Sequence, residues 1–181
     1  GAGTPMLDGL VATASATADA MTGTDEHVDV ADAAARRAVS VRGAELAVRM
    51  YGDWALALLA VRRGDATEAD RLYAVLDGYG FRDYHGFGSD RVYGLLARTV
   101  GEADNAAARF EDALAFCRKA GYRPELAWTC CDYADTLLQR DAPGDREKAM
   151  SLLDESLSIS RDLGMRPLME RVLSRRKLLK A

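Results

Sequence analysis

The sequence predicts an all-α fold made of a short series of helical hairpins. From about Val30 onward, apolar residues recur at steps of three and four, which is the spacing of one face of a helix. Glycines fall where these apolar runs stop or begin, as helix ends and turns require. The pattern around Gly101 also returns around Gly144. The alternating pattern of β-strands is nearly absent.

Composition supports a helical fold and argues against some classes of partner. The 181 residues suit one ordinary domain or one compact repeat array, and only four are proline. Abundant alanine favours helices, since alanine loses no side-chain entropy on becoming helical. With 24 basic and 28 acidic residues the net charge is −4. A general nucleic-acid binder needs a positive surplus, so we expect no nucleic-acid partner.

The three cysteines predict a reduced protein without a metal site. An odd count at irregular spacing is not a disulfide framework, so we expect a cytoplasmic location. Cys130 and Cys131 are adjacent and would point about 100° apart on a helix, which is poor geometry for one ion. We therefore expect them, with Cys117, to be buried structural thiols. No apolar run approaches the roughly 20 residues that span a bilayer, so no membrane partner is expected.

The beginning of the chain differs from the rest. Residues 1–29 are rich in Ala, Thr, Ser, Asp and Gly. Leu7, Leu10 and Val11 can start a short helix, which the polar segment 22–25 would end. We expect a flexible or loosely docked leader over 1–29, followed by a helical-repeat domain over 30–181. The opening lacks an initiator Met, which indicates a tag remnant or a domain cut from a longer chain.

The helices are expected in the following order. Residues 30–48 have a helical pattern that Gly43 divides into two helices. Beyond them, the glycines separate helices at roughly 53–62, 66–77, 90–99, 103–120, 125–140, 145–163 and 167–179.

An internal repeat is the strongest signal in the sequence. A shift of 43 residues places the segment beginning at Gly101 over the one beginning at Gly144, and a shift of 37 relates Gly64 to Gly101. The first shift superimposes Ala106 on Ala149, Leu114 on Leu157, Arg118 on Arg161, Gly121 on Gly164, Arg123 on Arg166 and Pro124 on Pro167. One helical pair cannot bury its own apolar side, so stacking of neighbours must form the core.

The repeat unit resembles the tetratricopeptide family, whose unit of about 34 residues places small residues where two helices pack closely. The chain supplies Ala57, Gly64, Ala69 and Tyr73 in one unit, Gly94, Gly101, Ala106, Phe110 and Ala113 in the next, and Ala134, Ala149, Leu153 and Ser156 in the third. The inter-unit proline of the family is replaced by Arg118 and Arg161, and the units are longer.

The resemblance covers about residues 45–181. It implies a right-handed α-α superhelix of about three hairpins with a capping helix at the C-terminus. The longer units are similar to arrays at the C-terminal ends of large bacterial regulators, including signalling ATPases, nucleotide cyclases and transcription activators. The resemblance implies no catalytic residue.

The resemblance also implies that a partner binds in a concave groove lined by the first helix of each pair. The residues that map to this groove are Tyr51, Trp54, Arg62, Arg91, Arg98, Trp128 and Asp135. Arg91 and Arg98 are suited to clamp a carboxylate, and the two Trp residues to act as apolar anchors. The other interpretation, which we favour for each residue taken singly, is that both Trp residues are core and both Arg residues are solvated; taken together, the groove stays the place to look for a partner.

Two further segments have two interpretations each. The Gly- and aromatic-rich stretch 79–88, which contains His85, either contacts a ligand or seals the joint between two helical pairs. The basic residues of the last helix, Arg171, Arg175, Arg176, Lys177 and Lys180, either bind an acidic partner or face solvent on a capping helix. Sealing and capping are the interpretations we favour.

Together these observations predict a cytoplasmic protein-interaction or scaffold module, a regulatory domain of a larger bacterial protein, and not an enzyme. Its partner would be a peptide, a partner domain or a second copy of the chain. A small-ligand sensor, binding in the groove or near 79–88, is the alternative. No catalytic triad, zinc-binding or phosphate-loop spacing occurs, so neither metal nor cofactor is expected.

Overall fold

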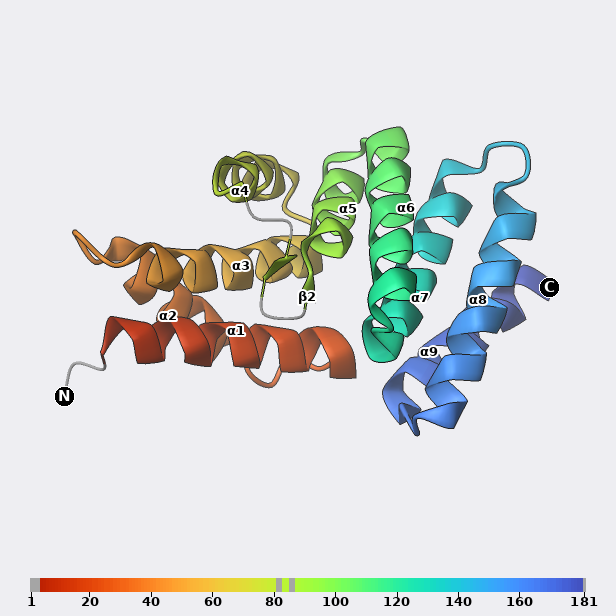
Figure 1. Cartoon of the computed structure of the whole chain (residues 1–181), viewed down its shortest axis with the longest axis horizontal. Helices are drawn as coiled ribbons and strands as arrows, with labels where there is room; N and C mark the ends of the chain where they lie inside the picture. The colour runs from red at the N-terminus through yellow and green to blue at the C-terminus, as the bar shows by residue number, and fades with distance from the viewer. Residues whose placement is uncertain (1–3, 81–82, 85–86, 181) are drawn as a thin grey trace. The chain divides into compact units, whose positions relative to one another are not determined.

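The computed structural model describes residues 4–80, 83–84 and 87–180. It is all-α, with helices that pack in chain order, and this confirms the predicted fold class. The chain forms two compact units, unit 1 over Gly1–Phe81 and unit 2 over Arg82–Ala181 (Figure 1). The division therefore lies near residue 81 and not between 29 and 30.

Unit 1 contains α1 (Pro5–Thr22), α2 (Val28–Ser40), α3 (Leu46–Arg63) and α4 (Ala66–Gly78). Unit 2 begins with a two-residue antiparallel ladder, β1 (Asp83–Tyr84) and β2 (Phe87–Gly88). Its helices are α5 (Ser89–Val100), α6 (Ala103–Ala120), α7 (Arg123–Arg140), α8 (Asp145–Asp162) and α9 (Arg166–Lys180). None of the described helices is both long enough and apolar enough to cross a membrane.

Most helix limits agree with the sequence. The helix α6 spans 103–120 as predicted, and Gly43, with φ 76°, lies between α2 and α3. The helix α3 begins at Leu46, well before the expected start near residue 53. Here the prediction was too short because Gly52, which interrupts the pattern, lies inside the helix instead of ending it.

The N-terminal segment is a docked helix, so the expectation of a loose leader is wrong for residues 5–22. The helix α1 packs on both α2 and α3. Its residues Gly9, Ala12 and Ala16 are buried, and Asp19 accepts hydrogen bonds from the His27 backbone N–H and ring Nδ1 at 2.8 and 2.9 Å. Small residues gave a weak apolar signal in the sequence, but they allow close packing against neighbouring helices.

Close helix crossings hold unit 1 together. A Cβ added to Gly52 of α3 would lie 2.6 Å from Val39 Cγ1 and 3.0 Å from the Ala35 carbonyl oxygen of α2. The buried residues of α2 are all alanines, namely Ala31, Ala34, Ala35 and Ala38. The backbones of α2 and α3 therefore approach more closely than larger side chains would permit.

Unit 2 has the small residues of the repeat at its crossings. Ala106, Ala134 and Ala149 have no exposed surface. A Cβ on Gly94 of α5 would lie 2.9 Å from the ring of Phe110 on α6. That ring is fully buried and stacks on Tyr133 of α7 with 5.4 Å between centroids. The predicted role of small residues as spacers is thus confirmed for this unit.

The Gly94–Phe110 contact gives a test of this packing. We expect Gly94→Ala to lower the free energy of unfolding by about 1–3 kcal/mol, because the added methyl group displaces a buried ring that has no room to move. Urea unfolding followed by circular dichroism measures the change.

Gly78→Ala is the matched control, since a Cβ at this helical glycine meets no atom within 4 Å. It should raise the free energy of unfolding slightly, by less than about 1 kcal/mol, because alanine favours helix. Equal losses in both variants would contradict the importance of the Gly94 crossing.

Candidate interaction face

The three groove residues predicted in unit 1 are occupied within that unit. Trp54 is 5% exposed and belongs to the core. The backbone oxygen of Tyr51 accepts a hydrogen bond from Thr13 of α1 at 3.0 Å. Arg62 donates to Asp25 at 2.5 Å and to the Asp19 carbonyl at 3.3 Å. Tyr51 and Arg62 therefore help to hold the N-terminal segment, which the sequence predicts to be loose.

In unit 2, the four predicted residues gather around Asp132 of α7. Glu125, Trp128, Asp132 and Asp135 are spaced by three, four and three residues, which places them on one face of α7. Asp132 is only 2% exposed. A carboxylate this deeply buried needs charged partners, and neighbouring helices supply them.

The helix α5 supplies Arg91. Its Nε donates to Asp132 Oδ2 at 2.8 Å, and its Nη1 lies 3.4 Å from Glu125 Oε1. Arg91 is 9% exposed, so the alternative of a solvated arginine is wrong for this residue. Two carboxylates of the protein itself already pair with Arg91. This side chain is therefore not available to bind the carboxylate of a ligand, which is the role that the sequence predicts for it.

The last helix supplies two more arginines. Arg171 Nη2 lies 2.7 Å from Asp132 Oδ1 and 3.0 Å from Asp135 Oδ2. Arg175 Nε donates to Asp135 Oδ1 at 2.7 Å. The favoured interpretation of a solvated basic face is thus wrong for both residues, although Leu168 and Val172 dock α9 as expected.

Trp128 lies among these charges and is 4% exposed. The guanidinium carbons of Arg91 and Arg171 are 5.6 and 5.9 Å from its ring centroid, within the range of cation–π attraction. Trp128 therefore helps to hold both arginines, and its burial agrees with the core alternative for this residue.

The pKa of Asp132 reflects this arrangement. Burial alone would raise the pKa, but the positive charges of Arg91 and Arg171 outweigh burial and hold it below the ordinary value of 3.8. The carboxylate therefore stays ionised and joins α5, α7 and α9 through charge-assisted hydrogen bonds.

Arg98 is the remaining predicted residue and differs from the other arginines. It follows Arg91 by seven residues on α5, so it lies on the same side of that helix. Its charge also lowers the pKa of Asp132. It is partly exposed, and no ion pair joins it to any residue in the described part of the chain.

We call this set the arginine face. The arginine face contains four arginines and three acidic residues, so its described residues carry a net charge of one positive unit. It consists of Arg91, Arg98, Glu125, Trp128, Asp132, Asp135, Arg171 and Arg175.

Sequence reasoning missed Asp132 and Glu125 and assigned Arg171 and Arg175 to solvent. The spacing of acidic residues along α7 could have indicated the first two, since they share a face with Trp128 and Asp135. The ion pairs between α9 and α7 depend on the tertiary structure, so the sequence pattern could not indicate them.

The other candidate sites add little to this face. Cys117, Cys130 and Cys131 are buried and free, as predicted, and burial raises the pKa of the Cys117 thiol to about 11. No cluster of His, Cys, Asp or Glu among the described residues is arranged to hold a metal ion.

The stretch 79–88 is described only in part, and its residues Phe81, Arg82, His85 and Gly86 lie outside the described residues. Within it, the Tyr79 hydroxyl donates to buried Asp53 at 2.6 Å. A hollow of about 290 Å³ lies elsewhere, at the C-terminal ends of α7 and α9. Its lining includes Leu138, Arg175 and Leu178, so it adjoins the arginine face.

We expect Asp132→Asn to destabilise unit 2 by about 3 kcal/mol, because it removes the charge that compensates two buried or half-buried arginines. Urea unfolding at neutral pH measures the loss. Asp104→Asn is the control: Asp104 pairs with Arg140, but its side chain is 95% exposed. That substitution should change stability by no more than about 0.5 kcal/mol.

The stability difference between the parent chain and Asp132→Asn should depend on pH. Since folding lowers the pKa of Asp132 below 3.8, its stabilisation is complete above that value and is lost as the pH falls through the folded-state pKa. The two unfolding curves should therefore converge in acid. A difference that stays constant down to the lowest pH at which both fold would contradict a role for the Asp132 charge.

The comparisons with known proteins do not add a relative. No protein-family model, no curated protein and no solved structure matches this chain.

Proposed function

We propose that this chain is a protein-interaction and scaffold module, a cytoplasmic regulatory domain of a larger bacterial signalling protein. In this proposal the arginine face of unit 2 takes up a peptide or a partner domain. The spacing of small residues, which resembles that of the tetratricopeptide family, supports this proposal, because partners of that family bind along the first helix of each pair. The free, buried thiols agree with a reducing compartment.

One observation carries the proposal: Asp132 joins three helices by ion pairs while Arg98 beside it has none in the described part of the chain. The ion pairs order the side chains of the face before a partner arrives, which reduces the entropy lost on binding. Arg98 then offers guanidinium N–H groups to acceptors on the partner. A preordered surface with one available cation is suited to recognition.

Peptide selection tests this function. A random peptide library displayed on phage is panned against the purified chain, and the selected peptides are synthesised and titrated by fluorescence anisotropy. We expect peptides that compete for one site. Arg98→Glu should weaken their binding about tenfold or more, because it reverses the charge that meets the acceptors of the partner.

Arg161→Glu is the matched control, since Arg161 is an exposed arginine of α8 outside the face. It should leave peptide affinity unchanged. Failure to select any peptide, or peptides that bind Arg98→Glu as tightly as the parent chain, would contradict the proposal.

A further inference from the structure

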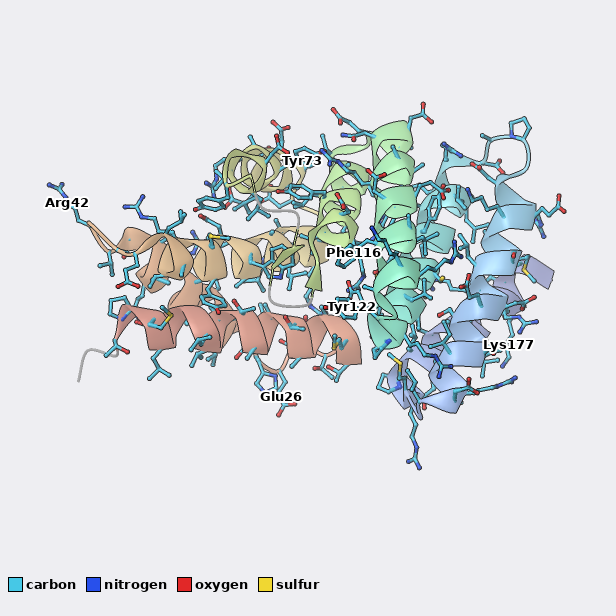
Figure 2. All side chains as sticks on the ribbon, in the orientation of Figure 1. Glu26, Arg42, Tyr73, Phe116, Tyr122 and Lys177 are labelled. Carbon is cyan, nitrogen blue, oxygen red and sulfur yellow. The ribbon has the colours of Figure 1, made fainter. Side chains whose placement is uncertain are left out.

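The helix α9 has little apolar surface with which to dock. Within its described part, the buried side chains are Leu168 and Val172. By contrast, twelve residues of α7 and eight of α8 are buried. The opposite side of α9 is polar, with Glu170, Ser174 and Lys177 exposed (Lys177 is labelled in Figure 2). Apolar burial therefore contributes less to the docking of α9 than to the packing of its neighbours.

Ion pairs supply much of the remaining attachment. Guanidinium nitrogens of Arg171 and Arg175 lie 3.0 and 2.7 Å from the carboxylate oxygens of Asp135 on α7. On the other side of α9, Arg176 pairs with Asp154 of α8 at 3.0 Å. The three arginine side chains are 30%, 38% and 25% exposed. Because water and salt reach pairs of this kind, the docking of α9 depends on ionic strength.

Separation of α9 leaves the buried Asp132 with a partner. Its Oδ2 still accepts a hydrogen bond from Arg91 of α5 at 2.8 Å. Its Oδ1, which lies 2.7 Å from Arg171, becomes accessible to water when α9 moves away. A carboxylate that keeps one cation and regains water is not an uncompensated buried charge. The ion pairs of α9 can therefore break while the rest of unit 2 stays folded.

The docking of α9 also sets the charge of the arginine face. With α9 docked, the face contains four arginines and three acidic residues. Without Arg171 and Arg175, only Arg91 and Arg98 remain against the same three acidic residues. The net charge of the face then changes from one positive to one negative unit. A surface that changes sign also changes which partners it attracts.

We propose that α9 is a detachable strap, which opens from α7 while α5–α8 stay folded and thereby reverses the charge of the arginine face. In such a local opening, one element separates at a lower free energy than the whole domain unfolds. The proposal is separate from the proposed function, since α9 opens or stays docked whether or not the face binds a peptide.

Two adjacent thiols of α7 report the opening. Burial raises the pKa of the fully buried Cys131 to about 12, and the charges of two arginines of α9 also act on it. Burial raises the pKa of Cys130 as well, but the neighbouring charges that act on this thiol are Glu155 of α8 and Arg118 of α6. Opening of α9 therefore exposes Cys131 and leaves Cys130 covered.

Alkylation of the native chain with iodoacetamide, read at each cysteine by peptide mass spectrometry, tests the opening. We expect Cys131 to react at least about tenfold faster than Cys130 and Cys117, because only global unfolding exposes those two. Raising NaCl from about 0.05 to about 0.5 M should speed the reaction of Cys131 about threefold or more, since salt screens the ion pairs of α9. Amide hydrogens of α9 should also exchange faster than those of α7 and α8.

Two arginine variants separate the strap from general loss of stability. Arg175→Gln should raise the alkylation rate of Cys131 about threefold or more, because it removes an ion pair that holds α9. Arg123→Gln is the matched control, since Arg123 pairs with Asp162 of α8 at 2.6 Å and these side chains are 50% and 57% exposed. It should leave the rate at Cys131 unchanged. Circular dichroism confirms that both variants are folded.

Charged thiol reagents test the sign of the open face. A cationic and an anionic methanethiosulfonate are compared at Cys131, with each rate divided by the rate at a small free thiol. We expect the cationic reagent to be favoured about threefold or more, because the carboxylates around Cys131 lose their α9 partners on opening.

Alkylation of Cys131 that is no faster than that of Cys130 and Cys117 would overturn the proposal, since α9 would then open only on global unfolding. So would equal effects of Arg175→Gln and Arg123→Gln, or a preference of Cys131 for the anionic reagent. None of these outcomes bears on peptide selection by the arginine face.

Discussion

The close crossing of α5 and α6 is the constraint on which unit 2 depends. Gly94 has no side chain, so the ring of Phe110 occupies the space where a Cβ would lie. The ring also stacks on Tyr133 of α7, which links three helices through one buried side chain. This packing holds α5 where Arg91, on the turn before Gly94, reaches Asp132. The small residue at this crossing thus positions the charged side chain of Arg91 as well as the apolar core.

Once Asp132 is buried, its charge determines much of the remaining arrangement. An isolated carboxylate in this position would cost several kcal/mol of desolvation, so it is stable only between cations. Arg91 comes from α5 and Arg171 from α9, and the ion pairs therefore join α7 to helices that are not its neighbours in the chain. Electrostatics orders the face, while apolar packing of Leu168 and Val172 docks α9.

In unit 1, small residues allow the N-terminal helix to pack closely on its neighbours. The N-terminal helix packs its Gly and Ala side against α2 and α3, and Arg62 bonds to the segment that follows it. The first hairpin consequently has its predicted groove residues engaged by its own chain. The opposite side of α1 carries Leu7, Leu10 and Val11, which are exposed.

Local pattern in the sequence determined the all-α class, most of the helix limits and the positions of the close crossings of unit 2. These properties depend on residues near one another in the chain, such as the glycines at turns and the small residues at regular spacing. The sequence also indicated that Arg91 shares a side of its helix with Arg98, and Trp128 with Asp135, because a helical face is a local property. Tertiary structure alone decided that α1 docks on α3 and that Arg171 returns to Asp132, 39 residues earlier. The spacing of residues along a helix shows which of them share a side. Which helix packs against that side depends on tertiary packing and on the free-energy cost of burying charge.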